Sequence, residues 1–544
     1  MQKEWATKLD GRKWSFDKIT SEILQARGIM DLDRFLYPIE EDLIPFKKLK
    51  NIETAAEIVV DGINNNKNFF IYADTDTDGL SSAAIMARYL VNFEKRGGIT
   101  PYINQGKMHG LDSSAPCFQE KYDIVIIVDS IQEDTELYEK LLERGSEIVV
   151  LDHHEITTAV RRFQQKIHLV SSMNEYPNPY LCGAGVTLKF CLYLDSLLGT
   201  NYADDYYDLA ACGICADMME VGPESLENRY ICYRGFSNLK NKALRLIKGS
   251  YPMCATTISY SIAPLVNAAN RTNKNWEALD LFLSEDDDEI GELIKILKNC
   301  KEVQNERIEK LYEQIENQIS EQKENKVMFF VLEDADNVSG LVANKILSEY
   351  QKPVIITQKT VNADGEEVYS GSLRAVGVED FSKMVNKTRV AKAMGHSNAA
   401  GFTVTAQNKQ KFQEKMEKQL KDVEFVQRVD ADIKLSQKQI TSEFIKWTQA
   451  LNKISGQGFP AIKVLIEDVI NYKVGYMTAG KHTKITTPYM MFIKWNSRDW
   501  ESLTEDASLS LVGTLDEGYI GKTLYKKMII EDYSVDPKIE IDLN

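Results

Sequence analysis

The sequence predicts an α/β protein with a doubly wound parallel-sheet domain, a long connecting helix, a second α/β domain and a C-terminal β-barrel. Three apolar runs of β type between residues 69 and 151 alternate with helical patterns, as in a doubly wound sheet. From Trp276 to about Lys323 the only Gly or Pro is Gly291, which predicts one long helix or a pair. After about residue 425 the chain is rich in β-formers and short turns, which is typical of a small barrel.

Length and composition indicate the class of protein. A chain of 544 residues exceeds what one hydrophobic core can organise, so several domains are expected. The 43% hydrophobic and 27% charged content is that of an ordinary soluble protein, the first residues form no signal peptide, and residues 251–270 are too polar to span a membrane. We therefore expect a cytoplasmic protein without membrane contact. The formal net charge of −16 argues against a uniformly basic surface but leaves room for a local basic patch.

Acids or histidines follow each of the three apolar runs. They are Asp74, Asp76 and Asp78 after the first run, Asp129 after the second, and Asp152, His153 and His154 after the third. The carboxyl ends of parallel strands meet at one edge of a sheet, so these side chains should converge. Alternate residues of an extended segment point the same way, so the first three acids should face one crevice. With the later Asp217, the pattern predicts a site for two divalent ions, and the histidine favours Mn²⁺ over Mg²⁺.

The segment from Asp74 to Gly79 also matches the first six positions of a calcium-binding EF-hand loop. Position twelve of such a loop is Glu, whereas here it is Ile85, and the preceding segment is a strand instead of a helix. The EF-hand interpretation is therefore rejected. We expect a crossover helix with Ser81 or Ser82 as its N-cap and Gly97-Gly98 as its end.

The eight cysteines are scattered and mostly lie in apolar runs, as expected of reduced core residues. Cys212 and Cys215 form a CxxC pair, but no second pair stands at zinc-ribbon spacing. Packing in the core is favoured over a redox or zinc role.

The stretch from Lys473 to Trp500 combines basic and aromatic residues. The basic ones are Lys473, Lys481, Lys484, Lys494 and Arg498, and the aromatic ones are Tyr476, Tyr489, Phe492, Trp495 and Trp500. Such a mixture fits a surface that contacts phosphates and stacks on bases. An ordinary half-buried sheet explains the composition equally well.

The order of these motifs resembles that of the DHH phosphoesterase superfamily, and in particular its RecJ branch of single-strand-specific DNA exonucleases. Gly371-Ser372-Leu373-Arg374 and residues 395–402 look like the phosphate-binding elements of the DHH-associated domain. Pro264, Asn267-Ala268-Ala269, Arg271 and residues 480–484 resemble further RecJ segments. The chain departs from the usual RecJ pattern at Met394, at Asn270 and in the turn 456–460.

The resemblance implies an arrangement of five parts. They are an N-terminal helical lead-in (1–50), a DHH catalytic domain (51–255), a connecting helix (256–325), a DHH-associated domain that binds phosphate or DNA (326–424) and a barrel of the oligonucleotide-binding type (425–544).

The resemblance also implies phosphodiester hydrolysis with two divalent ions, Mn²⁺ preferred or Mg²⁺. The implied metal ligands are Asp74, Asp76, Asp78, Asp129, His153 and Asp217, with Asp129 as the bridge. We expect Asp152 to orient His153, and His154 to touch the scissile phosphate or protonate the leaving group. The implied substrate contacts are Arg271, Ser372, Arg374, Gly395, His396, Lys481, His482 and Lys484.

The function expected from the resemblance is degradation of single-stranded DNA from the 5′ end in DNA repair or recombination, by a monomer that works with a single-strand-binding protein or a helicase. One alternative is a DHH phosphodiesterase for short oligonucleotides or cyclic dinucleotides, which would need only the two α/β domains. The other is a DNA-binding replication scaffold without catalysis, which would not need the complete set of acids.

Overall fold

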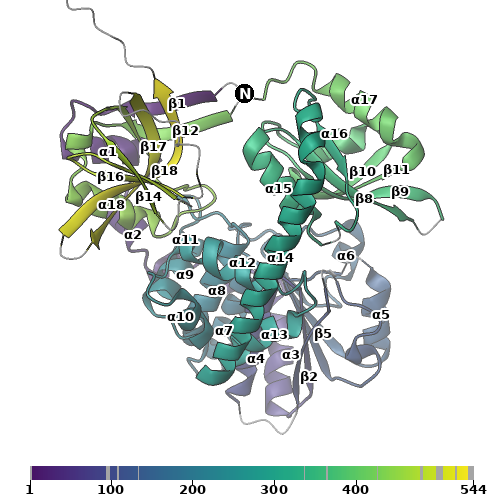
Figure 1. Cartoon of the computed structure of the whole chain (residues 1–544). Coiled ribbons are helices and arrows are strands. Elements are labelled where there is room, and N and C mark those ends of the chain that lie inside the picture. The colour runs from purple at the N-terminus through teal and green to yellow at the C-terminus, as the bar shows by residue number, and fades with distance from the viewer. Residues whose placement is uncertain are drawn as a thin grey trace, which may run out of the picture. The chain divides into compact units, whose positions relative to one another are not determined.

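The computed structural model describes residues 3–93, 98–106, 110–132, 134–335, 337–362, 365–425, 427–477, 482–495, 497, 507–520 and 523–536. The chain divides into two compact units. Figure 1 labels their helices and strands. The larger unit contains residues 5–297 and 429–544, and the smaller one contains residues 1–4 and 298–428. None of the helices in the described ranges combines the length and the apolar character needed to cross a bilayer.

A five-stranded, wholly parallel sheet forms the centre of the first α/β domain, in the order β3-β2-β4-β5-β6. Its strands are β2 Phe69–Ala73, β3 Ile99–Ile103, β4 Ile124–Val128, β5 Glu147–Asp152 and β6 Leu169–Ser171. The helices of this domain are α3 Ile52–Asn64, α4 Thr77–Val91, α5 Thr135–Glu143, α6 Thr158–Phe163, α7 Gly183–Leu198, α8 Tyr207–Ala216, α9 Leu226–Ser237 and α10 Lys242–Lys248. Strands β2 and β4 are fully buried on both faces, as parallel sheets require, and the three apolar runs are confirmed as strands.

The register of this sheet brings the acids together. Ala73 pairs with Val128, and Val128 pairs with Leu151. The residue that follows each of these positions is Asp74, Asp129 or Asp152, so three acids come from one edge of the sheet.

The predicted start of the crossover helix was wrong. Helix α4 begins at Thr77, and its N-cap is Asp76, whose carboxylate accepts hydrogen bonds from Asp78 N and Gly79 N. An aspartate that accepts two backbone N–H groups is a stronger cap than a serine further along. The alternation argument was also wrong, because Asp78 lies in the first helical turn. Helix α4 ends at Val91, and Gly97 lies outside the described residues.

The region between the two α/β domains contains a pair of helices, one of the two predicted possibilities. After the short helices α11 Ala255–Thr257 and α12 Ala263–Val266 come α13 Asn275–Leu283 and α14 Asp287–Gln322. The acidic residues 285–289 lie at the start of α14, where the Asp286 carboxylate accepts from Asp288 N and Glu289 N. Leu311, Ile315 and Ile319 of α14 are buried, as their spacing predicts.

The smaller unit is a second α/β domain built on a mixed sheet in the order β10-β11-β9-β8-β7. Its elements are β7 Met328–Val331, α15 Ser339–Tyr350, β8 Val354–Val361, β9 Glu367–Arg374, α16 Phe381–Lys387, β10 Ala391–His396, β11 Ala399–Thr405 and α17 Lys409–Gln419. Strands β7 and β8 are parallel and the other pairs are antiparallel. Separate apolar clusters cover the two faces, one with α14 and α15 and one with α16 and α17.

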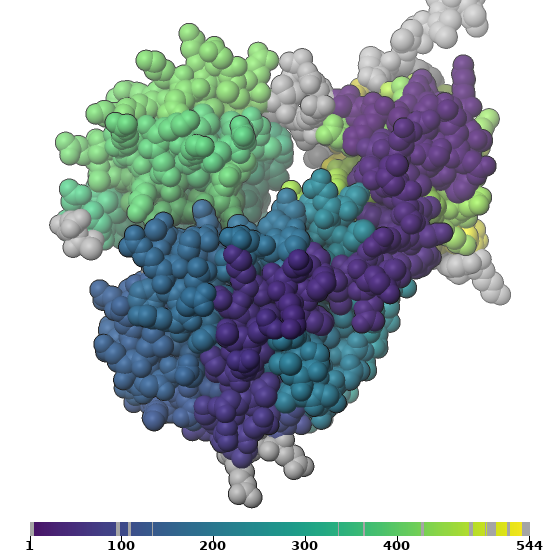
Figure 2. Space-filling model, turned by 180° about the vertical axis from the view of Figure 1, so that it is seen from behind, coloured from purple at the N-terminus to yellow at the C-terminus, as the bar shows by residue number. Residues whose placement is uncertain are grey.

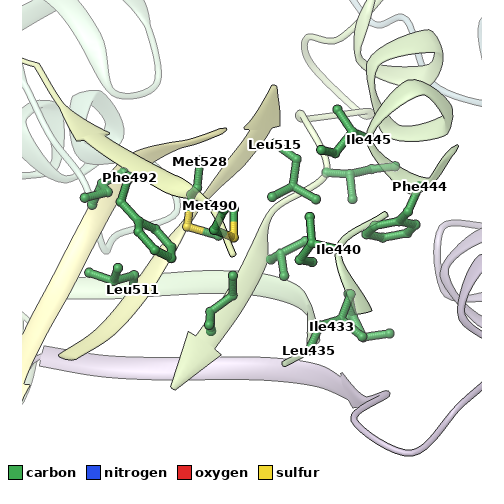
Figure 3. Packing of buried hydrophobic residues seen from close by; sticks show 14 of the residues in the cluster. Ile433, Leu435, Ile440, Phe444, Ile445, Met490, Phe492, Leu511, Leu515 and Met528 are labelled. Atoms are coloured by element: carbon green, nitrogen blue, oxygen red, sulfur yellow. The ribbon is translucent and has the colours of Figure 1, made fainter. Parts of the chain in front are cut away.

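The C-terminal domain is an eight-stranded sheet in the order β1-β12-β13-β17-β18-β16-β15-β14, consistent with an oligonucleotide-binding barrel. Its elements are β1 Lys3–Asp10, β12 Gln427–Lys434, α18 Ser442–Asn452, β13 Val464–Val469, β14 Lys473–Met477, β15 His482–Thr486, β16 Met491–Lys494, β17 Ser508–Ile520 and β18 Thr523–Asp536. Figure 3 shows how Leu435, Phe444, Phe492 and Leu515 come from separate segments and meet in one apolar core.

The N-terminal residues differ from the expected helical lead-in, because their first element is strand β1 of the barrel sheet. Helices α1 Phe16–Ala26 and α2 Leu32–Leu36 follow, and Ile19, Ile23 and Phe35 complete the barrel core. The purple N-terminal residues therefore cover part of the barrel in Figure 2. Strand β1 was missed because its sequence has few apolar residues and its partner β12 lies more than 400 positions away, which no local pattern reveals.

Candidate metal centre

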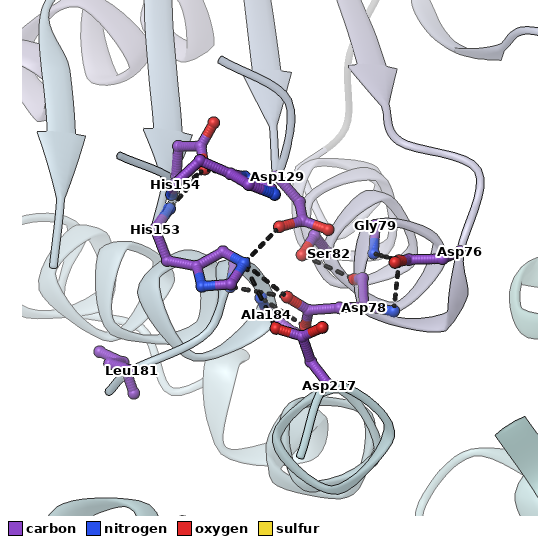
Figure 4. A network of polar contacts seen from close by, with 12 residues as sticks. Asp76, Asp78, Gly79, Ser82, Asp129, His153, His154, Leu181, Ala184 and Asp217 are labelled. Atoms are coloured by element: carbon purple, nitrogen blue, oxygen red, sulfur yellow. Dashed lines mark hydrogen bonds and ion pairs between the residues drawn. The ribbon is translucent and has the colours of Figure 1, made fainter. Parts of the chain in front are cut away.

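Six predicted ligands converge at the carboxyl edge of the first sheet, and Figure 4 labels all of them except Asp74. Three sets of ligand atoms lie close enough to hold an ion. The sets are Asp74, Asp76 and Asp129; Asp78, His153 and Asp217; and Asp129, Asp152, His153 and His154. Asp129 and His153 each connect two sets, so the arrangement suits a pair of ions that share ligands.

His153 occupies the middle of the carboxylates. Its Nε2 lies 3.2 Å from Asp129 Oδ1, 3.6 Å from Asp217 Oδ2 and 3.8 Å from Asp78 Oδ2. The His153 side chain is only 10% exposed. One imidazole nitrogen therefore faces three carboxylates from the end of strand β4, helix α4 and the end of helix α8, as Figure 4 shows.

Asp78 is held by the start of helix α7. Its Oδ2 accepts from Gly183 N at 2.8 Å and its Oδ1 accepts from Ala184 N at 3.1 Å. A Cβ at Gly213 would lie 2.1 Å from Asp78 Oδ1, and a Cβ at Gly183 would lie 2.5 Å from Asp129 Oδ1. The two glycines thus let the carboxylates approach the helices closely. The sequence signal was the Gly-Ala-Gly at 183–185, which our sequence reasoning missed.

Asp129 combines burial with an unusual backbone. It is 2% exposed and has a φ of 53°, a left-handed conformation that costs energy outside glycine and is common at functional sites. Among the described residues no hydrogen-bond donor satisfies its Oδ1. Burial, and then the charges of Asp78, Asp76, Asp152 and Asp74, hold the pKa of Asp129 well above its ordinary value. The metal-free site therefore has an excess of negative charge.

The pKa of Asp217 is also raised. Burial and the carboxylates of Asp78 and Asp76 raise its pKa to about 8. Divalent cations remove both penalties, because they neutralise the carboxylates and satisfy the open oxygen. The hard oxygen donors with one imidazole fit Mn²⁺ or Mg²⁺.

Asp152 and His154 form a separate pair beside the ligands. The His154 Nδ1 lies 2.8 Å from Asp152 Oδ1, and the same oxygen accepts the backbone N–H groups of His153 and His154. Asp152 was expected to orient His153, and this was wrong, because the His153 ring faces Asp129 while the His154 ring faces Asp152. Burial alone would lower the pKa of His154, but Asp152 outweighs it and raises the pKa to about 10. The Asp152 carboxylate thus favours the protonated imidazole of His154, whose side chain is 41% exposed.

The loop with the first acids is tied to the segment after α12. Thr77 Oγ1 donates to Asn267 Oδ1 at 2.7 Å, and Asn270 Nδ2 donates to Thr75 O at 3.2 Å. Arg271 Nη1 donates to Asn267 O at 2.5 Å, which places this predicted substrate contact in the segment beside the loop. Asn270, one of the departures from the family pattern, thus has a structural contact.

A second group of predicted residues lies in the smaller unit. Arg374 pairs with Ala399 across β9 and β11, and His396 pairs with Ala399 across β10 and β11, so Ser372, Arg374 and His396 share one face of the sheet. Gly395, with a φ of 127°, precedes the turn of this hairpin.

The same face meets the start of helix α15, which sequence reasoning missed. Ser372 Oγ lies 2.8 Å from Ser339 Oγ, and a Cβ at Gly340 would lie 2.6 Å from Arg374 Nη2. Burial lowers the pKa of Arg374, and no carboxylate of the described residues forms an ion pair with it. An arginine, two hydroxyls and a helix N-terminus make a suitable anion site. The only sequence signal was the Ser339-Gly340 pair before an apolar helix.

The predicted DNA-contacting residues of the barrel are only partly described. Lys481 lies outside the described residues, as do Arg498 and Trp500. The β14–β15 register places Lys473, His482 and Lys484 on one face, and the His482 ring contacts Trp495 at 4.8 Å between centroids. Tyr476 pairs with Thr483 and therefore points to the opposite face. Lys494 also pairs with Thr483 and lies on that opposite face, so the basic and aromatic side chains of the stretch are divided between the two faces. Cys212 and Cys215 are buried in α8, as expected of core residues.

Comparison with known proteins gives the same picture. Residues 68–214 match the model of the DHH family, N-terminal domain. The chain is 29% identical over 469 residues to a Bacillus subtilis (strain 168) protein named as a putative SPbeta prophage-derived single-strand DNA-specific exonuclease, YorK, covering 79% of each chain. It is 23% identical over 530 residues to the single-stranded-DNA-specific exonuclease RecJ of the same bacterium, covering 92% of this chain and 65% of RecJ.

Solved structures share the fold. The RecJ structure from Thermus thermophilus in complex with Mn²⁺ superposes with a TM-score of 0.79 at 21% identity, covering 99% of this chain and 80% of that one. A second structure of that protein contains Mg²⁺. Residues 68–214 therefore match the DHH family, N-terminal domain, and the chain as a whole is similar to proteins named as RecJ single-strand-specific exonucleases.

Proposed function

We propose that the chain is a metal-dependent exonuclease that degrades single-stranded DNA by hydrolysing phosphodiester bonds. The observation that carries this proposal is the convergence of four aspartates and His153 around Asp129, where burial and neighbouring carboxylates raise the pKa values of Asp129 and Asp217. The names of the 29% identical relative and of RecJ supply the substrate class.

Six side chains would hold the two ions, and Asp129, whose carboxylate belongs to two ligand sets, could contribute to both. The ligands are Asp74, Asp76, Asp78, Asp129, His153 and Asp217. When bound, two divalent ions supply positive charge for the phosphate oxygens and lower the pKa of an attacking water.

The pair of Asp152 and His154 would act on the leaving group. Asp152 fixes the orientation of the ring through Nδ1 and keeps the imidazole protonated, so the partly exposed Nε2 can give a proton to the departing oxygen or bind a phosphate. The buried carboxylate itself remains charged, because the positive His154 lowers its pKa despite the burial.

Phosphate groups of the strand would be bound in the smaller unit by Arg374, Ser372 and the start of helix α15, with Gly395 and His396 on the neighbouring hairpin. Arg271 and, in the barrel, Lys481, His482 and Lys484 are further candidates for contact with DNA. The 5′→3′ direction, a role in repair or recombination, work as a monomer, and cooperation with a single-strand-binding protein or helicase are finer parts of the same proposal, supported by the resemblance to RecJ.

The test follows product lengths from single-stranded DNA labelled at the 5′ or the 3′ end, with Mn²⁺, with Mg²⁺ and with EDTA. The proposal expects immediate release of short products from the 5′-labelled strand, abolished by EDTA. Immediate release from the 3′ label would reverse the direction. Hydrolysis of di- to pentanucleotides only would assign an oligonuclease, and binding without cleavage of any substrate would leave a scaffold.

A further inference from the structure

Three consecutive polar side chains at the start of helix α9 are completely buried. Glu227, Asn228 and Arg229 are 2%, 0% and 1% exposed. Glu227 pairs with the buried Lys189 and accepts from Ile44 N, which anchors the N-terminal segment. The other two residues bind a loop that the proposed metal site depends on.

That loop, residues 218–222, follows the candidate ligand Asp217 directly. Met218 has a φ of 53°, a left-handed backbone conformation. Its side chain is exposed, so packing of that side chain does not explain this conformation. Asn228 Nδ2 donates to Glu220 O at 2.9 Å, and Arg229 Nη1 donates to Val221 O at 3.0 Å. The loop thus has side-chain anchors three and four residues after Asp217.

The same arginine also binds the barrel. Its Nη1 donates to Ile454 O at 2.9 Å and its Nε donates to Phe35 O at 2.6 Å, while the guanidinium lies over the Phe35 ring at 3.5 Å from the centroid. No carboxylate of the described residues forms an ion pair with Arg229, and a buried cation without a counter-charge is costly. A buried arginine at this position is explained if its hydrogen bonds to three separate segments are needed.

Backbone contacts join the two segments directly. Val221 N donates to Gln457 O at 3.0 Å, and Glu220 and Gln457 form an isolated parallel bridge. A Cβ at Gly222 would lie 2.9 Å from Gly458 O, and a Cβ at Gly458 would lie 1.5 Å from Glu220 Oε1, so the loop and the barrel turn 454–460 are in close contact. Arg27 Nη1 holds the other end of this turn through Pro460 O at 2.7 Å.

We propose that Arg229 is a positioning residue for Asp217, which acts by clamping loop 218–222 to the barrel turn 454–460. The inference rests on the metal site of the proposed function. The barrel would then have two roles, the proposed contact with DNA and, through its turn 454–460, the support of the metal ligand Asp217. A version of the protein without the barrel would lose the partner of Val221 N and one of the acceptors of Arg229.

The experiment measures Mn²⁺ affinity in the full chain, from the electron paramagnetic resonance signal of free Mn²⁺. Gly222→Ala pushes the loop and turn apart and should weaken at least one Mn²⁺ site about tenfold, as expected for a change in ligand support. Arg229→Lys, which loses most of the hydrogen bonds, should do the same. Gly291→Ala adds its methyl group where nothing lies within 4 Å and should stay within about twofold of wild type.

A milder variant covers the case in which Gly222→Ala or Arg229→Lys does not fold. Glu220→Ala adds no bulk but removes the bond from Gly222 N to Glu220 Oε1, and should weaken Mn²⁺ about threefold. Folded variants that bind Mn²⁺ like wild type would overturn the positioning role alone. A wild-type protein that binds no Mn²⁺ would overturn the metal assignment itself, and with it this inference.

Discussion

Asp217→Asn should stabilise the metal-free protein while it weakens metal binding. The carboxylate is crowded by Asp78 and Asp76 and partly buried, and its pKa is raised to about 8. An acid with a raised pKa stabilises the folded state below its unfolded pKa near 4, and this stability is lost as the pH rises towards 8. Asparagine never ionises, so the variant should escape that loss.

The size of the effect follows from the shift. At pH 7 the ionisation of Asp217 costs up to about 4 kcal/mol, at 1.36 kcal/mol for each pKa unit between 3.8 and 7. A third of the side chain is exposed, so solvent screening reduces this to about 2 kcal/mol. A gain of that size corresponds to a rise of about 2–4 °C in the melting temperature of the larger unit.

The assay is differential scanning calorimetry in EDTA and in Mn²⁺, at pH 5 and pH 7. In EDTA the variant should melt above wild type at pH 7 and nearer to it at pH 5. Saturating Mn²⁺ should raise the melting temperature of wild type, since 100 times the Kd adds about 2.7 kcal/mol for each ion, but raise the variant less. A variant that is less stable than wild type in EDTA, or equally stabilised by Mn²⁺, would refute the reasoning.

Three further changes test the other parts of the site. His154→Ala should lower kcat about 100-fold with the Mn²⁺ affinity within about threefold of wild type, because we propose His154 as the acid and not as a ligand. Single-turnover kinetics and a Mn²⁺ titration check this, and an equal loss of Mn²⁺ affinity would make His154 a ligand. Arg374→Lys should weaken single-stranded DNA binding about tenfold in fluorescence anisotropy, because the planar guanidinium matches a phosphate, and unchanged binding would remove it from the DNA path. Lys189→Met should destabilise the protein by about 3–5 kcal/mol in urea unfolding, because Glu227 loses its buried partner. The control is Lys295→Met, which removes an exposed ion pair with Glu292. Equal losses of stability in the two variants would contradict the reasoning.

The strands and the convergence of the acids at one sheet edge could be predicted because they depend on local patterns. A fully buried parallel strand is an apolar run, and an acid at its end must lie at the carboxyl edge of the sheet. The backbone path between Asp74 and Asp78 could not be predicted as simply. The prediction that alternate side chains point the same way requires an extended segment, whereas Asp76 caps a helix that begins at Thr77.

Contacts between distant segments were not predictable from local patterns. Nothing near Asp152 indicates that its carboxylate meets the ring of His154 instead of His153, since both are neighbours in sequence and only the ring directions differ. Strand β1 needed its partner β12, and the support of Asp217 by Arg229 needed the barrel turn 454–460. Such contacts are visible only once the chain is folded.

The most direct test of the central claim is the rate of nucleotide release from single-stranded DNA as Mn²⁺ is titrated into wild type and Asp129→Asn. The account predicts that wild-type activity rises with the occupancy of its Mn²⁺ sites, and that Asp129→Asn, which lacks the carboxylate shared by two ligand sets, loses at least about 1,000-fold at any Mn²⁺ concentration. Full activity of wild type in EDTA, or of Asp129→Asn in Mn²⁺, would contradict it.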